Sequence, residues 1–139
     1  MEDVRCYQIG NSAIKFEDSI NFDSMGCIMD LIEIMLPNID QENGLTIYWN
    51  SVGGAVHDLA DFTDFIYGLP DDLNIRFVIN GYAFSGGAFM IYDLIDRCAM
   101  QIAEGASIMF HTALLDSRSR NERENKTNDK TIEMFTSRY

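Results

Sequence analysis

Two glycine-rich turns, each between an apolar β-type run and an amphipathic helical pattern, constrain the fold of this chain most. The first turn spans residues 50–55 and follows the run 45–49, and the second spans residues 81–87 and follows the run 75–79. Further strand-like runs and helical patterns alternate before and after them. This alternation indicates βαβ units and a largely parallel sheet covered by helices, an α/β fold.

The remaining elements are read from apolar spacing and turn residues. Further strands are predicted at the following residues: 4–9, 13–16, 98–103 and 108–110. A first helix is expected to begin at a cap formed by Asp23 or Ser24 and to end near Pro37. A second begins at Val56 and is stopped by Gly68, and a third begins after Gly87.

Both turns are suited to holding an oxyanion. Turns that follow parallel strands gather at one edge of an open α/β sheet, where sites form. Glycine permits positive φ, and the N–H groups at a helix start carry partial positive charge. Ser85 stands directly before Gly86 and Gly87, where a nucleophile would be presented. The alternative is that Ser85 only caps the helix that follows. Neither turn has the lysine of a phosphate loop.

A serine nucleophile needs a base, and the chain has two histidines. His57 is predicted to lie in the first turn of an amphipathic helix, on its solvent side. His111 follows the strand-like run 108–110, so it is expected at the same sheet edge as the glycine turns. A structural role for His111 and a catalytic one are both open at this point.

Charge and composition exclude several classes of protein. The 139 residues carry a net charge of −12, but residues 1–116 hold 4 basic and 18 acidic side chains, whereas residues 117–139 hold 6 basic and 4 acidic ones. Such an acidic body repels phosphates, so neither nucleic acid nor a nucleotide is expected as a partner. No apolar run is long enough for a membrane helix, and the start of the chain does not resemble a secretory signal.

Three widely spaced cysteines, Cys6, Cys27 and Cys98, suit a reducing compartment, and a cytoplasmic location is expected. They are expected to pack as small apolar groups. No cysteine or histidine cluster has metal-ligand spacing, so neither a metal nor another cofactor is expected.

Three motifs, in order, resemble the proteolytic subunit of the Clp protease family. Residues 50–54 (Asn-Ser-Val-Gly-Gly) are similar to its Asn-Ser-Pro-Gly-Gly motif, and residues 81–88 (Gly-Tyr-Ala-Phe-Ser-Gly-Gly-Ala) to its Gly-x-Ala-x-Ser-Met-Gly-Ala nucleophile turn. Residues 107–111 (Ser-Ile-Met-Phe-His) resemble the segment that ends in its catalytic histidine. The resemblance covers roughly residues 14–113.

This resemblance implies a fold, a mechanism and an assembly. The fold would be a crotonase-like spiral of ββα units. Ser85 would be the nucleophile, His111 the general base, and the N–H groups of Gly54 and Gly86 the oxyanion hole. The activity would be that of an ATP-dependent type of serine endopeptidase acting on polypeptide, in a homo-oligomeric ring served by an ATPase unfoldase. Residues 1–116 would form the core, and residues 117–139 a projecting, handle-like segment that is partly disordered.

The sequence departs from the family pattern in three places. Val52 stands where the family has proline, and Gly86 stands where methionine is usual. The triad aspartate of the family comes well beyond the histidine, after the projecting helix, and the chain stops at Tyr139 before that point. Asp116 is the one nearby substitute, although a surface role is the simpler interpretation. The chain is therefore expected to be a fragment, to take the acid from elsewhere, or to be weak or inactive.

Other functions are weighed against the peptidase. A catalytically inactive relative that serves as an assembly or binding module is the main alternative, because the third acid is missing. An acyl-CoA enzyme of the same fold is disfavoured, since the acidic body offers little to hold a phosphate. A Ser-Lys peptidase is disfavoured because the only lysines, Lys15, Lys126 and Lys130, are not near the glycine turns in sequence.

Overall fold

The structure is a computed structural model that describes residues 3–110 of the chain. His111, Asp116 and the segment 117–139 lie outside the described residues, so the predicted boundary at residue 116 stays a prediction.

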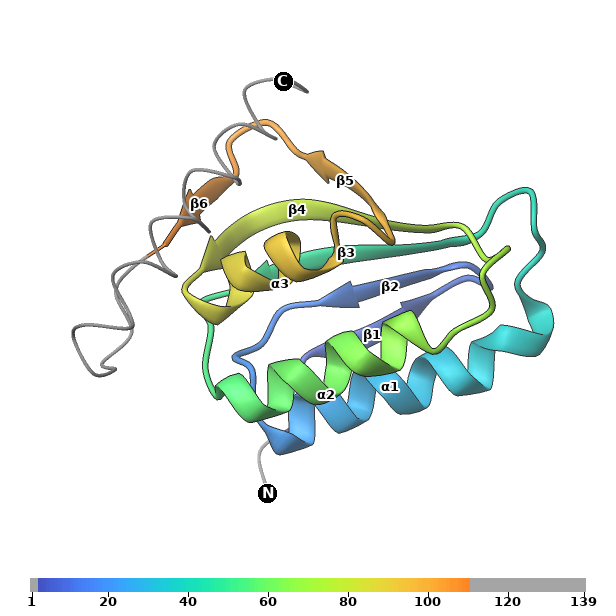
Figure 1. Cartoon of the computed structure of the whole chain (residues 1–139), viewed down its shortest axis with the longest axis horizontal. Helices are drawn as coiled ribbons and strands as arrows, with labels where there is room; N and C mark the ends of the chain where they lie inside the picture. Colours follow the sequence, from blue (N-terminus) through green and yellow to red (C-terminus); the bar gives the residue numbers. More distant parts are fainter. Residues whose placement is uncertain (1–2, 111–139) are drawn as a thin grey trace.

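Strands and helices alternate along the chain, as the sequence pattern indicated (Figure 1). The elements are β1 (Cys6–Ile9), β2 (Ala13–Phe16), α1 (Phe22–Met35), a 3-10 turn η1 (Leu36–Asn38), β3 (Leu45–Ser51), α2 (Val56–Tyr67), β4 (Ile75–Phe84), α3 (Gly86–Leu94), β5 (Ala99–Ile102) and β6 (Ser107–Met109).

The strands form one sheet in the order β1-β2-β3-β4-β5. Within residues 3–110, only β1 and β2 are paired antiparallel and every other pair is parallel, which confirms the predicted sheet. Strand β4 is long enough to pair with two different strands, β5 and β6, along the same side. Its first half pairs with β5, through Arg76↔Ala99, and its last residues pair with β6, through Phe84↔Met109. The chain after β5 is thereby returned to the carboxyl end of β4.

The helices cover one face of this sheet. Helix α1 packs on α2, and α2 packs on α3, which also contacts β4 (Figure 1). Along β3 the side chains alternate between buried and half-exposed, with Leu45, Ile47 and Trp49 turned to the helices. This alternation follows from the period of two in a strand.

Four aromatic rings form the centre of the core between sheet and helices. Trp49 stacks on Phe16 and Phe62, with ring centroids 4.7 and 5.9 Å apart, and meets the edge of Phe77 at 5.9 Å. Each of the four side chains is fully buried. The core therefore lies directly behind the end of β3, where the first glycine turn begins.

Several predicted boundaries differ from those in the structure, and two of these differences have a clear physical cause. Helix α1 is capped by Asn21, whose side-chain oxygen accepts the N–H of Ser24 at 2.8 Å, while Ser24 Oγ accepts the N–H of Asn21 at 3.0 Å. Ser24 therefore belongs to a reciprocal capping box and is not the cap residue. Strand β4 continues to Phe84, so the second turn is confined to the residues around Ser85. Pairing with β6 extends β4 across Gly81, a tertiary effect that the local glycine signal does not contain.

Candidate functional site

The two glycine turns meet at the carboxyl ends of β3 and β4, as predicted. A Cβ atom on Gly53 would lie 2.7 Å from the carbonyl oxygen of Phe84 and 3.0 Å from Cβ of Ser85. Gly53 has a φ of 101°, which L side chains rarely adopt. Glycine at this position thus allows the first turn to touch the second.

Ser85 has an unusual backbone conformation. Its φ is 53° and its ψ is −119°, and within residues 3–110 it is the one non-glycine residue with a positive φ. It occupies the N-cap position of α3, yet its side chain makes no capping hydrogen bond. The capping interpretation is therefore not supported. A strained serine at a sharp strand-to-helix turn is the geometry that exposes a nucleophilic hydroxyl.

Two backbone N–H groups lie next to this serine. Ile20 bridges the first turn, because its N–H donates to Gly53 O and its carbonyl accepts the N–H of Ala55, both at 2.8 Å. Neither of these two hydrogen bonds involves the N–H of Gly54. Gly86 starts α3, so its N–H has no partner within the helix. A Cβ on Gly86 would lie 3.6 Å from Gly54 N, so the two amides are neighbours.

Two polar side chains shape these turns, and sequence reasoning named them only as part of the motif at residues 50–54, without a role. Asn50 Oδ1 accepts the N–H of Tyr82 at 2.8 Å, where the register between β3 and β4 shifts. Ser51, which is 2% exposed, accepts the N–H of Gly53 through Oγ at 3.2 Å. The signal that was available is their position, since two consecutive polar residues end strand β3, with only Val52 between them and Gly53.

Strand β6 brings the chain to the same place. Ser85 donates its N–H to the carbonyl oxygen of Met109 at 2.8 Å. The ring of Phe110 meets Phe89 of α3 edge to face, with centroids 5.3 Å apart. The last described residues before His111 therefore lie beside the Ser85 turn. The other histidine, His57, is exposed on α2, as predicted.

The three cysteines are buried or half-buried in the fold. Cys6 and Cys98 are buried and Cys27 is half-buried, and all three are free thiols, which confirms that they pack in the core or at its edge. Burial raises the pKa of Cys98 to about 12.

Within residues 3–110, no helix has the length and apolar character needed to cross a membrane.

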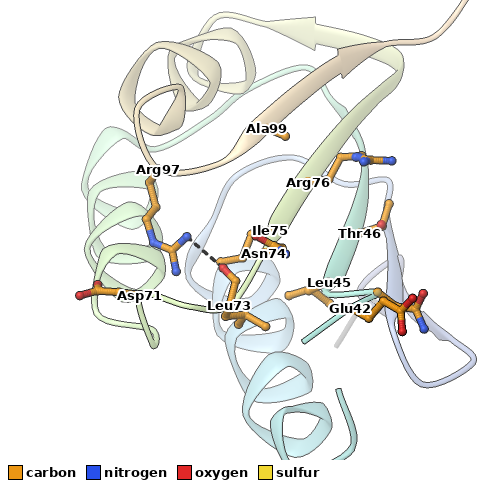
Figure 2. A pocket seen from close by; sticks show the side chains of 11 residues that line it. Glu42, Leu45, Thr46, Asp71, Leu73, Asn74, Ile75, Arg76, Arg97 and Ala99 are labelled. Carbon is orange, nitrogen blue, oxygen red and sulfur yellow. Dashed lines mark hydrogen bonds between the residues drawn. The ribbon is translucent and has the colours of Figure 1, made fainter. Parts of the chain in front are cut away.

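A pocket of about 380 Å³ opens at the other edge of the sheet, and it is not part of this site. It is lined by residues at the amino ends of β3, β4 and β5, including Thr46, Arg76 and Ala99 (Figure 2). The guanidinium of Arg97 donates to the carbonyl oxygens of Leu73 and Pro70, at 3.1 and 2.8 Å. Arg97 therefore fixes the loop before β4.

Comparison of the sequence with protein-family models and with curated proteins finds no match. Comparison with solved structures does. A ClpP1 mutant from Listeria monocytogenes superimposes with a TM-score of 0.62 at 14% identity, covering 91% of this chain and 71% of that chain. The ClpP protease catalytic domain from Plasmodium falciparum gives 0.61 at 18% identity, covering 93% of this chain and 68% of that chain. This chain therefore has the crotonase-like α/β fold of the ClpP catalytic domains.

Proposed function

We propose that this chain is a serine endopeptidase subunit of the ClpP type. Ser85 is the nucleophile, His111 is the general base, and the N–H groups of Gly54 and Gly86 form the oxyanion hole. The identity of the third acid stays open, and Asp116 is the candidate from this chain. The observation that carries the proposal is the strained backbone of Ser85, whose side chain caps nothing although it stands at a helix N-terminus.

The oxyanion hole is supported by the contact between the two turns. Nucleophilic attack on a peptide carbonyl places negative charge on its oxygen, and two converging N–H groups stabilise that charge. Gly54 and Gly86 supply neighbouring amides that the described hydrogen bonds leave unused. The positive end of the α3 dipole adds to this stabilisation, because Gly86 is the first residue of that helix.

The base is supported by the path of β6. In the proposed reaction, Ser85 Oγ attacks the carbonyl carbon as His111 takes the hydroxyl proton, and His111 returns that proton to the leaving amine. Water then hydrolyses the acyl-enzyme by the same route. The Ser85 N–H to Met109 carbonyl bond and the Phe89–Phe110 contact direct the chain toward the nucleophile just before His111.

The substrate class and assembly follow from the same likeness. The structural neighbours are ClpP proteases, so we propose polypeptide substrates, a homo-oligomeric ring in the cytoplasm and an ATPase unfoldase as partner. Self-association is supported by the sheet face opposite the helices. Tyr7 and Ile9 are about half exposed there, at 49% and 46%, and Tyr48 lies on the same face. A largely parallel sheet normally has both faces covered. A monomer in sedimentation analysis across concentrations would contradict the assembly.

The nucleophile is tested with a fluorophosphonate probe, which reacts with activated serine hydroxyls. We expect one modified peptide, containing Ser85, and no modification in Ser85→Ala. The matched control is Ser107→Ala, which removes an exposed serine on β6 and should leave labelling unchanged. Equal labelling of the wild type and Ser85→Ala would overturn the proposal and favour an inactive assembly or binding module.

A further inference from the structure

The conformation of Ser85 has to be held by its surroundings, since a positive φ costs a non-glycine residue free energy. Backbone bonds contribute on both sides of it: its N–H donates to Met109 O, and its carbonyl accepts the N–H groups of Ala88 and Phe89 at 2.9 and 3.0 Å. Close packing contributes as well, because a Cβ on Gly87 would lie 2.6 Å from Ser51 O. These contacts fix the first turn of α3 against the end of β3.

One side chain also reaches this turn by a hydrogen bond. The indole Nε1–H of Trp49 donates to the carbonyl oxygen of Gly87 at 3.1 Å. Among the side-chain hydrogen bonds of the described residues, this is the one that reaches residues 84–88. Gly87 follows Ser85 by two positions, so the bond acts on the turn that carries the nucleophile.

The donor itself is rigid. Trp49 is 0% exposed and is stacked between Phe16 and Phe62, with Phe77 against its edge. Because the Trp49 ring is held on three sides, its indole N–H stays in one place and holds the carbonyl group of Gly87 that accepts its hydrogen bond. Trp49 also belongs to β3, five residues before Gly54, so the same residue is connected to both halves of the proposed oxyanion hole.

A buried indole N–H needs a partner for stability alone, and that explanation is the simpler one. It does not explain the choice of partner, however. Any carbonyl near the core would satisfy the donor, whereas Gly87 O lies in the first turn of α3, next to Gly86. We propose that Trp49 is a positioning residue, which sets the distance between the N–H groups of Gly54 and Gly86 and holds Ser85 in its reactive conformation. This inference rests on the role proposed for Ser85.

The chain contains a single tryptophan, which allows a test that removes little more than the donor. Growth with benzothienylalanine replaces the indole N–H by sulfur while keeping the shape of the rings. We expect the maximal rate of fluorophosphonate modification of Ser85 to fall at least about 10-fold, since a displacement of about 1 Å at a reacting group can cost on the order of 10²-fold. Probe binding before the chemical step should change little. Trp49→Phe, which also lacks the donor, should show the same loss if the first variant does not fold.

The matched control is Ile32→Val, which removes one buried methylene from α1, a helix that contains none of the three rings packed on Trp49. It should lower thermal stability and leave the modification rate within about 3-fold, in keeping with an effect on packing alone. Similar rates in the wild type and the donor-free variants would overturn this inference and leave the role of Ser85 standing. A loss in Ile32→Val equal to that in the Trp49 variants would also overturn it, because stability would then explain both. No modification of Ser85 in the wild type would overturn the proposed function and this inference together.

Discussion

Ser85 donates its backbone N–H to the carbonyl oxygen of Met109 at 2.8 Å, and this bond joins the end of β4 to the end of β6. The two residues are 24 positions apart in the sequence. The bond has two consequences. It fixes the turn that presents Ser85, and it places the residues before His111 beside that turn. The proposed nucleophile and base thus depend on the pairing of the last strand with the far half of β4.

The two glycines of the proposed oxyanion hole should respond differently to alanine. At Gly54, where φ is 152°, a Cβ would lie 2.0 Å from the carbonyl oxygen of Ile20, so Gly54→Ala must break the bridge between these residues. We expect the free energy of unfolding to fall by about 2 kcal/mol or more. At Gly86 the nearest atom is Ile20 Cδ1, at 3.3 Å, which is the end of a flexible side chain.

Gly86→Ala should therefore change the free energy of unfolding by less than about 1 kcal/mol, since helical backbone suits alanine. Urea denaturation of both variants provides the comparison. Equal losses of stability would contradict the geometry described for the two turns.

The architecture was largely predictable from local patterns. The alternation of strands and helices, the parallel sheet and the meeting of the glycine turns follow from apolar spacing and the turn residues. The extension of β4 across Gly81 was not predictable in this way. It depends on β6, which pairs with β4 from more than 20 residues away in the sequence. The glycine signal correctly marked a special backbone, with φ at 123°, but not the end of the strand.

The candidate site was predicted in part. Ser85, Gly54 and Gly86 were identified, and the structure brings them together. The supporting residues were missed because their roles are purely tertiary. The sequence pattern predicts only that Trp49 is a core residue of a strand. The residues around it in the sequence do not indicate that its N–H reaches Gly87. The structure tests the positions of Ser85, Gly54 and Gly86 but not their roles, which stay predictions, as do those of His111 and Asp116.

Alkaline pH should destabilise the fold through Cys98. Burial raises its pKa to about 12 in the folded chain, while a thiol in the unfolded chain titrates near 8.5. Between these values the unfolded state loses the proton that the folded state keeps, so the free energy of unfolding falls as pH rises. One such thiol contributes up to about 1.4 kcal/mol per pH unit.

Cys98→Ala removes this contribution, so between pH 9 and about 10.5 its stability should decline more gently than that of the wild type. Denaturation curves collected at several pH values give both slopes, with pH 7 as the reference for the cost of the substitution itself. Identical slopes would show that the Cys98 thiol does not titrate differently in the two states.

Asp116 should have little influence on Ser85 if it is a surface acid. Asp116→Asn is then expected to leave both the folding transition and the rate of probe modification close to those of the wild type. The measurement is the modification rate, followed by mass spectrometry. A fall approaching 10⁴-fold without unfolding is the loss expected for the acid of a triad, and it would assign Asp116 as the third member.

The account as a whole depends on whether Ser85 is activated by His111. The most direct measurement is the rate at which a fluorophosphonate modifies Ser85, mapped by mass spectrometry, in the wild type and in His111→Ala at neutral pH. We predict that the wild type is modified at Ser85 and that His111→Ala reacts about 10²–10⁴-fold more slowly, because the hydroxyl proton then lacks an acceptor. Equal rates in the two chains, or modification at a residue other than Ser85, would contradict the account.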